Sequence, residues 1–256
     1  MNAKGVFVLM CLNLVFTIGP IPLESGERGF VSSYKEYESI CNDTNVIVVG
    51  SVGHSGSTML YEAVVESCED RPVIKTHCLP PPKDRFQGKI IYIYSDPHKS
   101  IESLIHKATG TLKAHMRNMQ TGDKELSDEL SQGFYDDKEM ILKQRLLQQD
   151  LYGYFVHLDC WLRRLPICDP EQANVLAIKY ENLWEEESIK AIRFFLQDDS
   201  FQLPFYRPRG DYELTAVEIN ARNAMNLGSK EHPRYKAYDD AWNIWNTTPS
   251  IQWSNL

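Results

Sequence analysis

The chain has 256 residues, of which 43% are hydrophobic and 11% aromatic, so it can bury one sizeable core. Its formal net charge of -8 argues against nucleic acid or an acidic membrane surface as the main partner, because both attract positively charged proteins. Any anion-binding site must therefore be local. No low-complexity linker or internal repeat interrupts the sequence, which favours one domain.

The first 25 residues are interpreted as a secretory signal peptide or a membrane anchor. A short flank containing Lys4 precedes an uncharged apolar run from Gly5 to Leu23. Prolines near the end of the run favour cleavage, and an uncleaved type II anchor stays an alternative. Both predict a protein of the secretory pathway, in the Golgi lumen or secreted. The sequons at Asn42 and Asn246 fit that passage and predict a glycoprotein.

Five cysteines follow the leader, and an oxidising compartment would pair some of them and leave at least one over. Cys160 and Cys168 lie on either side of a predicted helix end at Leu165-Pro166. We therefore expect a disulfide bond between these two residues.

Buried strands and helices alternate through the middle of the chain. After a polar, partly irregular lead-in at 26–44, continuous apolar runs predict strands that are buried on both faces. This order implies a three-layer α/β/α fold around a mostly parallel sheet, in which ligands bind at the carboxyl ends of the strands. We expect a core at 45–205 and a C-terminal extension at 206–256 that packs on it. The predicted strands are 46–51, 72–77, 89–94 and 174–180, and the predicted helical segments are 61–67, 97–107, 123–164 and 185–196.

A turn of eight residues, GHSGSTML, links the first core strand to its helix. The backbone N–H groups at the start of a helix point at one spot, where the helix dipole also favours negative charge. Small residues let a phosphate approach closely, and hydroxyl groups add donors. The turn therefore predicts a binding site for a phosphorylated nucleotide. Its residues are Gly53, His54, Ser55, Gly56, Ser57, Thr58, Met59 and Leu60.

The turn departs from two well-known motifs. A Walker A loop carries Gly-Lys before its Ser or Thr, whereas Gly56 is followed by Ser57. A nucleophile elbow, Gly-x-Ser-x-Gly, lacks only its last glycine here, so a hydrolase with Ser55 as the nucleophile stays an alternative, although only about one strand precedes the turn. An ordinary strand-to-helix turn without a ligand also stays open.

Four segments, taken in order, resemble the sulfotransferase family that uses 3'-phosphoadenosine 5'-phosphosulfate (PAPS). Together they cover roughly residues 45 to 200. The resemblance implies a fold of the P-loop nucleotide-binding type, PAPS as the donor, and a hydroxyl or amine of a carbohydrate, small molecule or tyrosine as the acceptor. The four segments are the turn at 53–60, Lys75-Thr-His77 before Leu79-Pro80, the strand and helix at 90–103, and the run from Trp161 through Tyr180-Glu-Asn-Leu183 to Leu196.

The resemblance also implies roles for single residues. His77 lies where the family places its catalytic base, and Lys75 lies where a lysine approaches the transferred sulfuryl group. Ser103 would bind the 3'-phosphate, and Tyr180 would shape the nucleotide pocket. A histidine with a pKa of about 6.5 can take a hydroxyl proton near neutral pH. The reaction needs no metal, and the sequence has no His-x-x-x-His or paired Cys-x-x-Cys spacing.

Two positions depart from the family pattern. His54 stands where the family carries Lys or Arg, and it can donate a hydrogen bond to the leaving group. Ser95 stands where the family has its 3'-phosphate arginine, and losing that contact weakens nucleotide binding by about 1.5 to 3 kcal/mol unless another cation replaces it. These departures leave open a second class of function, a module that binds a nucleotide or partner without transfer. Candidate replacement cations are His98, Lys99, Arg207 and Arg209.

The acceptor is expected to contact the loops at 79–86 and 109–123 and the C-terminal tail. That tail contains Trp242, Trp245 and Trp253, which we predict to be packing anchors.

Overall fold

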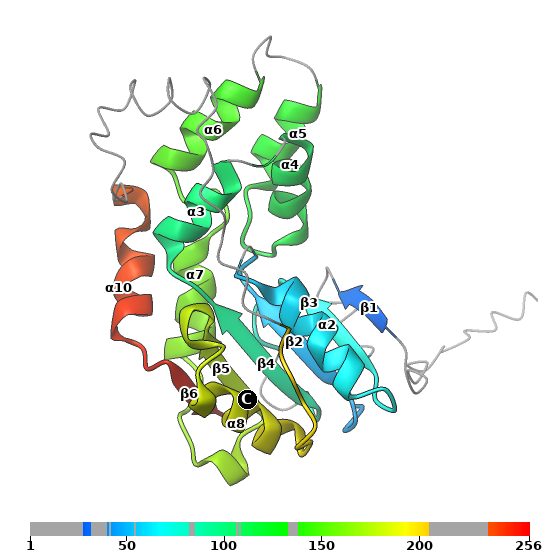
Figure 1. Ribbon diagram of the computed structural model, residues 1–256. Coiled ribbons are helices and arrows are strands. Elements are labelled where there is room, and N and C mark those ends of the chain that lie inside the picture. The colour runs from blue at the N-terminus through cyan, green and yellow to red at the C-terminus, as the bar shows by residue number, and fades with distance from the viewer. Residues whose placement is uncertain are drawn as a thin grey trace, which may run out of the picture.

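A six-stranded sheet forms the centre of the protein (Figure 1). Its strands follow the order β1-β3-β2-β4-β5-β6, in which the first five are parallel and β6 is antiparallel to β5. The predicted mostly parallel sheet is thus confirmed. The computed structural model describes residues 28–31, 40, 42–53, 55–81, 85–105, 107, 109–132, 138–204 and 235–256. The strands are β1 (Arg28–Val31), β2 (Ile47–Ser51), β3 (Val73–Thr76), β4 (Lys89–Tyr94), β5 (Val175–Lys179) and β6 (Ile251–Ser254).

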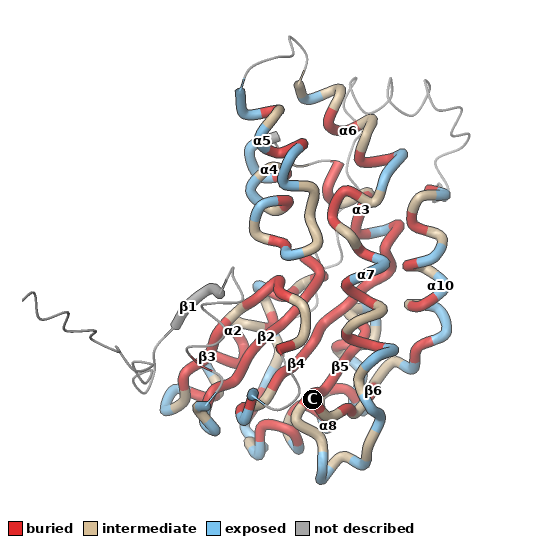
Figure 2. The backbone as a smooth tube through the Cα atoms, turned by 180° about the vertical axis from the view of Figure 1, so that it is seen from behind, coloured by how far each residue is buried: buried red, intermediate tan, exposed pale blue. Residues whose placement is uncertain are grey.

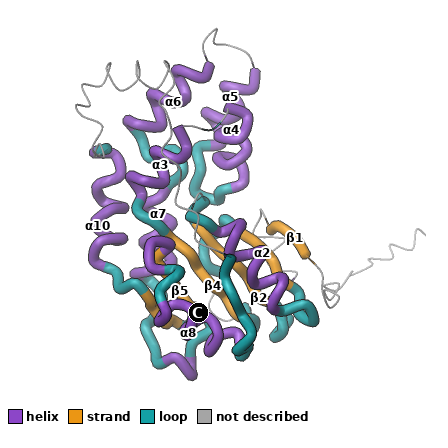
Figure 3. The backbone as a smooth tube through the Cα atoms, in the orientation of Figure 1, coloured by secondary structure: helices purple, strands orange, loops and turns teal. Residues whose placement is uncertain are grey.

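Helices cover both faces of this sheet, which confirms the three-layer α/β/α class (Figure 3). Helices α2 (Ser57–Ser67) and α8 (Glu186–Leu196) pack on one face, and the remaining helices contribute to the core of the other face. These are α3 (Pro97–Ile105), α4 (Thr109–Asn118), α5 (Lys124–Gln132), α6 (Lys138–Gln148), α7 (Tyr154–Leu158), the π-helix η1 (Asp159–Arg163) and α10 (Asp239–Thr247). Short 3-10 turns are η2 (Pro170–Gln172), η3 (Tyr180–Asn182) and η4 (Lys236–Tyr238).

Alternation along the strands divides the buried side chains between two cores. Val48 and Tyr92 face the core under α3 to α7 and α10, whereas Val49 and Ile91 face the core under α2 and α8. Figure 2 shows the central strands as almost wholly buried, as expected for continuous apolar runs. Trp245 and Trp253 pack against different cores, so these two act as the predicted anchors.

The strand register brings the carboxyl ends of the central strands to one edge. Gly50 pairs with Thr76 on one side and with Tyr92 on the other, and Tyr92 pairs with Ala177. Residues that follow β2, β3, β4 and β5 therefore meet at this edge. In Figure 1, helices α4, α5 and α6 stand together beyond it.

The four predicted strands are all present, and 89–94 agrees with β4 to the residue. The predicted loop at 109–123 is wrong over its first part, because α4 occupies Thr109–Asn118. The helical region 123–164 is divided into α5, α6, α7 and η1. One break falls at Gly153, whose φ is +65°, where the Asp150 carboxylate accepts hydrogen bonds from the amides of Tyr154 and Phe155.

Two edge strands were not predicted. Within the expected irregular lead-in, β1 pairs with β3, and within the C-terminal extension β6 pairs with β5. Both have four residues. Segments this short carry little periodicity, so contact with the sheet edge decides their conformation.

The expected disulfide bond is not formed, because Cys160 and Cys168 are both free thiols. Cys160 belongs to η1, whereas Cys168 lies in the loop before β5, and its own amide donates a hydrogen bond to Trp253 O. Cys68 is also a free thiol, and it belongs to a different core from Cys78, so the sheet separates these two residues.

The expected leader at 1–25 and Cys41 lie outside the described residues. Within the described part of the chain, none of the helices combines the length and apolar character needed to cross a membrane.

Candidate functional site

The turn between β2 and α2 has the backbone of an anion-binding loop. Gly53 and Gly56 have φ values of +82° and +78°, a region that glycine adopts far more easily than other residues. Gly56 is the N-cap of α2, and no described side chain caps this helix start. The amides of its first turn, including those of Ser57 and Thr58, have no partner within the helix. Together with the helix dipole, they favour an anion at this point.

The turn contains buried hydroxyl groups, on Ser55 and Ser57, and an exposed one, on Thr58. The Ser55 side chain is buried, and its Oγ donates to Gly53 O at 3.2 Å, so this hydroxyl stabilises the turn itself. Ser57 is also buried, whereas Thr58 is exposed. Thr58 Oγ1 accepts a hydrogen bond from Lys75 Nζ at 2.5 Å. The structure therefore brings a cation from β3 to the exposed side of the α2 N-terminus.

The Lys75 amine is half-buried at this position. Burial lowers its pKa, and the nearby Glu62 carboxylate acts in the opposite direction. An anion bound beside Lys75 would favour the charged ammonium, so the site is electrostatically suited to a phosphate or sulfate group.

The Tyr180 ring lies against the turn from the end of β5. A Cβ atom built on Gly56 would lie 2.1 Å from Tyr180 Cε2, which is too close for any side chain. Trp184 supports the ring edge-on, with a centroid distance of 5.4 Å. Gly56 is therefore required both for its φ angle and for the close approach of Tyr180.

His77 follows β3 and is only 4% exposed. Its Nδ1 lies 2.8 Å from Ser51 O and 3.1 Å from Ser51 Oγ. The carbonyl can only accept, so these hydrogen bonds assign the proton to Nδ1 and the lone pair to Nε2. Burial, followed by the neighbouring charges of His115 and Lys75, lowers the pKa of His77 to about 3. His77 is consequently a neutral imidazole at neutral pH.

His115 adds a second imidazole to the site and was missed by the sequence analysis. It projects from α4, with its ring centroid 5.7 Å from that of His77, and its Cδ2 would lie 3.4 Å from a Cβ atom on Gly53. Burial and the nearby Lys75 and Lys107 lower its pKa. No local motif surrounds His115, so only the packing of α4 over the turn could identify it.

The Ser95 hydroxyl, at the end of β4, is bonded within the protein. Its side chain is fully buried, and its Oγ forms a hydrogen bond of 2.5 Å with Ser100 Oγ. Asp96 caps α3 by accepting from the amide of His98 at 2.9 Å, and the Asp96 amide donates to Glu181 Oε1 at 3.0 Å. The start of α3 is thus occupied by groups of the protein itself.

The other residues proposed for the 3'-phosphate are dispersed. Ser103 is partly exposed on α3, and Lys99 is exposed. His98 Nδ1 accepts from the amide of Tyr235, just before η4, at 3.1 Å, and its Nε2 lies 3.7 Å from Asp239 Oδ1 at the start of α10. His54, Arg207 and Arg209 lie outside the described residues.

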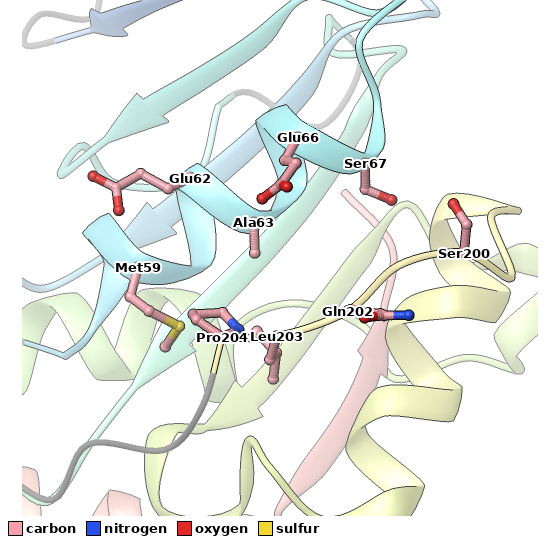
Figure 4. Close-up of a pocket in the computed structure, with 9 residues that line it drawn as sticks. All are labelled: Met59, Glu62, Ala63, Glu66, Ser67, Ser200, Gln202, Leu203 and Pro204. Carbon is pink, nitrogen blue, oxygen red and sulfur yellow. The ribbon is translucent and has the colours of Figure 1, made fainter.

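A cavity of about 410 Å³ lies beside α2 (Figure 4). It opens between this helix and the segment that follows α8, and it begins at Met59, the third residue of α2. Apolar and carboxylate side chains share its lining, which the sequence analysis did not identify. The lining residues are Met59, Glu62, Ala63, Glu66, Ser67, Ser200, Gln202, Leu203 and Pro204.

Among the described residues, no three or more His, Cys, Asp or Glu side chains are grouped so that they could hold a metal ion. The candidate site consists of the turn after β2, Lys75, His77 and His115, which the contacts above bring together.

The chain is similar to the solved structure of mouse sulfotransferase SULT7A1 complexed with PAP. The two sequences are 19% identical, the TM-score is 0.40, and the alignment covers 77% of this chain and 69% of that chain. No protein-family model matches the chain, and the comparison with curated proteins finds no match.

Proposed function

We propose that the chain binds PAPS and transfers its sulfuryl group to a hydroxyl or amine acceptor. The observation that carries this proposal is the N-terminus of α2, which has no side-chain cap and is preceded by two glycines at positive φ, with Lys75 Nζ 2.5 Å from Thr58 Oγ1. Backbone amides and a lysine together favour the 5'-phosphosulfate. The ordered motifs at 53–60, 75–77, 90–103 and 161–196 support PAPS over another nucleotide.

The chemistry is an in-line displacement at sulfur. The acceptor oxygen or nitrogen forms a bond to sulfur as the bond from sulfur to the bridging phosphate oxygen breaks. The acceptor proton passes to Nε2 of His77, and adenosine 3',5'-bisphosphate (PAP) leaves. Amides of the turn and Lys75 are suited to stabilise the charge that grows on the bridging oxygen. His54 would add a donor to this oxygen.

The low pKa of His77 constrains this role. A base with a pKa of about 3 accepts a proton poorly at neutral pH. A bound phosphosulfate places negative charge close to Lys75, a cation that lowers the pKa of His77, so donor binding raises that pKa. Burial remains the main cause of the low pKa, so donor binding only partly restores the basicity of His77.

The cavity beside α2 is the proposed place for the adenine base. Met59 and Leu203 offer apolar contact, and the carboxylates of Glu62 and Glu66 can accept hydrogen bonds from an amino group. An uncharged base suits this lining better than a phosphate does.

A binding module without transfer is the second candidate. The buried Ser95 hydroxyl and the Glu181 carboxylate at the start of α3 favour it, because neither helps to hold a 3'-phosphate. In this case the protein would bind PAP but move no sulfuryl group.

We further propose that the chain enters the secretory pathway, on the basis of its apolar leader and its sequons. Asn42 and Thr44 are both exposed, whereas Thr248 of the second sequon is buried and donates to Ile244 O at 2.7 Å. Asn42 is therefore the expected glycan acceptor. Glycosylation at Asn42 predicts a loss of mass on endoglycosidase treatment, and Asn42→Gln should abolish this loss. A chain that is secreted without a glycan contradicts the assignment of Asn42 as the acceptor.

Calorimetry with PAP and transfer of label from PAPS test the two functions. Binding with transfer to a carbohydrate, small-molecule or tyrosine acceptor supports the enzyme, and binding without transfer to any of these supports the module. Absence of PAP binding contradicts both. The hydrolase gains no support from that result, because the Ser55 hydroxyl is buried and donates to Gly53 O. For the enzyme, His77→Ala should remove turnover while leaving PAP affinity nearly unchanged. Normal turnover in this variant excludes His77 as the base.

A further inference from the structure

Side chains on one face of α7 and η1 contact both the turn after β2 and the segment after β3. The face carries Tyr154, His157 and Trp161, spaced three and four residues apart, so their side chains lie along one side of the helix. Each side chain donates to a main-chain carbonyl outside the helix. Tyr154 OH lies 3.3 Å from Gly53 O, His157 Nε2 lies 3.1 Å from His77 O, and Trp161 Nε1 lies 3.1 Å from Cys78 O.

The hydrogen bond of His157 is fixed from behind by Tyr92. The Tyr92 hydroxyl lies 2.9 Å from His157 Nδ1, and because Nε2 faces a carbonyl, the imidazole carries its proton on Nε2. Both side chains are fully buried. The Tyr92 ring also stacks on Trp161, with a centroid distance of 4.7 Å and an interplanar angle of 9°. Buried and mutually bonded groups of this kind hold one arrangement.

A change in helix type accompanies this face. After Leu158 the α-helix passes into the π-helix η1, and the Arg164 amide donates to Asp159 O, five residues earlier, at 3.1 Å. Such wide turns are rare and occur often at functional sites. Here the wide turn contains Trp161, the donor to the segment after β3.

We propose that Tyr154, His157 and Trp161 form a clamp that holds the turn after β2 and the segment after β3 in a fixed mutual position. Within the clamp, His157 is a positioning residue for His77, and Tyr92 fixes the orientation of His157. The catalytic part of this proposal rests on the proposed function, whereas the effect on the geometry of His77 does not.

The test follows the His77 ring by nitrogen-15 NMR of histidine-labelled protein. In the wild type, His77 should carry its proton on Nδ1 and exchange it slowly with solvent. Tyr92→Phe removes one hydroxyl and should accelerate this exchange about tenfold, as expected when one hydrogen bond of a network is lost. His157→Leu should have a larger effect, and His157→Gln, which restores a donor near His77 O, should reverse most of it.

Tyr152→Phe is the matched control. Tyr152 is 1% exposed in the same core as Tyr92, and its hydroxyl donates to Leu112 O on α4 at 3.1 Å rather than to a residue of the clamp. Its ring meets Tyr154 edge-on at 6.3 Å, and phenylalanine keeps that contact. Tyr152→Phe loses a comparable buried hydrogen bond and should leave His77 exchange unchanged. The proposal is overturned if Tyr152→Phe accelerates His77 exchange as much as Tyr92→Phe does, or if neither Tyr92→Phe nor His157→Leu changes it.

Turnover gives the second readout. His157→Leu should lower kcat about 10- to 100-fold through misplacement of the base, while KM for PAPS changes little. Tyr92→Phe should act in the same direction and less strongly. A fall in kcat that Tyr152→Phe reproduces contradicts a positioning role. If wild-type protein binds no PAP, the proposed function fails, and the NMR comparison still decides whether the clamp positions His77.

Discussion

Two helices begin at the same edge of the sheet and offer very different surroundings to an anion. Helix α2 follows β2, has Gly56 as its N-cap residue and has no side-chain cap among the described residues. Helix α3 follows the neighbouring strand β4, and the Asp96 side chain caps it. The Glu181 carboxylate accepts a hydrogen bond from the Asp96 amide. Parallel strands and helix dipoles are common to both. The residues at the cap therefore decide which of two topologically equivalent helix starts keeps its amides open to an anion.

We therefore expect the protein to bind the 5'-phosphosulfate of the proposed donor more strongly than its 3'-phosphate. The 5'-phosphosulfate meets unpaired amides and Lys75, whereas a 3'-phosphate near α3 meets a helix start already satisfied by carboxylates. Four experiments can break or sharpen this contrast.

The largest effect is expected from Gly56→Ala. The methyl group would meet the Tyr180 ring at a backbone φ that is unfavourable for alanine, so unfolding free energy should fall by about 2 to 5 kcal/mol and PAP binding should be lost. Gly110→Ala is the control, because a Cβ atom there contacts nothing within 4 Å in the exposed part of α4, and the change should stabilise the protein by about 0.5 to 1 kcal/mol. Urea denaturation measures both. Normal stability of Gly56→Ala contradicts the described turn.

Acidification should lower the stability of the protein through its two buried histidines near the site, His77 and His157. Burial lowers the pKa of His77 to about 3 and that of His157 to about 4, so between these values and about 6.5 the unfolded chain binds more protons than the folded one. Stability therefore falls as pH falls, by about 2 kcal/mol for each histidine between pH 7 and pH 5. Urea denaturation at several pH values measures the slope. His157→Gln should remove roughly half of it, and an unchanged slope shows that other groups dominate.

Lys75→Met should weaken PAP binding by about 1.5 to 3 kcal/mol, or roughly 10- to 100-fold, because a charge-assisted contact to the 5'-phosphate is lost. Lys190→Met removes the same charge from an exposed pair with Glu186 on α8 and should leave affinity unchanged. Calorimetry of both variants makes the comparison. Equal effects would indicate attraction by net charge rather than a contact at α2.

The smallest effect is expected from removing the 3'-phosphate. Adenosine 5'-phosphate should bind within about tenfold of PAP, since the start of α3 gives the second phosphate little charge-assisted bonding. Glu181→Gln removes a carboxylate from that point and should raise the affinity for PAP without changing that for adenosine 5'-phosphate. A preference for PAP above about 100-fold would instead assign the 3'-phosphate to a cation such as Arg207 or Arg209.

Local patterns in the sequence were sufficient for the central part of the fold. Apolar runs marked β2 to β5 because strands buried on both faces need continuous apolar residues. The edge strands β1 and β6 and the helix α4 were missed, because their four to ten residues take their conformation from neighbours distant in the chain.

The candidate site shows the same division. Motif order singled out Lys75, Thr58 and Tyr180, and the structure places all three around the turn after β2. His115 and His157 were not singled out, because each meets the site through the packing of a distant helix. The hydrogen bond between Ser95 and Ser100 was equally invisible, since burial rather than residue type makes this hydroxyl structural.

Helices α3 to α7 form one excursion of the chain, residues 95–174, between the adjacent strands β4 and β5. The entropy of closing such an excursion grows with the logarithm of its length, so a doubling costs only about 0.6 kcal/mol. A residue inserted within α7, by contrast, rotates every later side chain by about 100° around the helix axis. Insertions and deletions should therefore be tolerated in α4, α5 and α6, which lie farthest from the sheet (Figure 1), and should not be tolerated within α7.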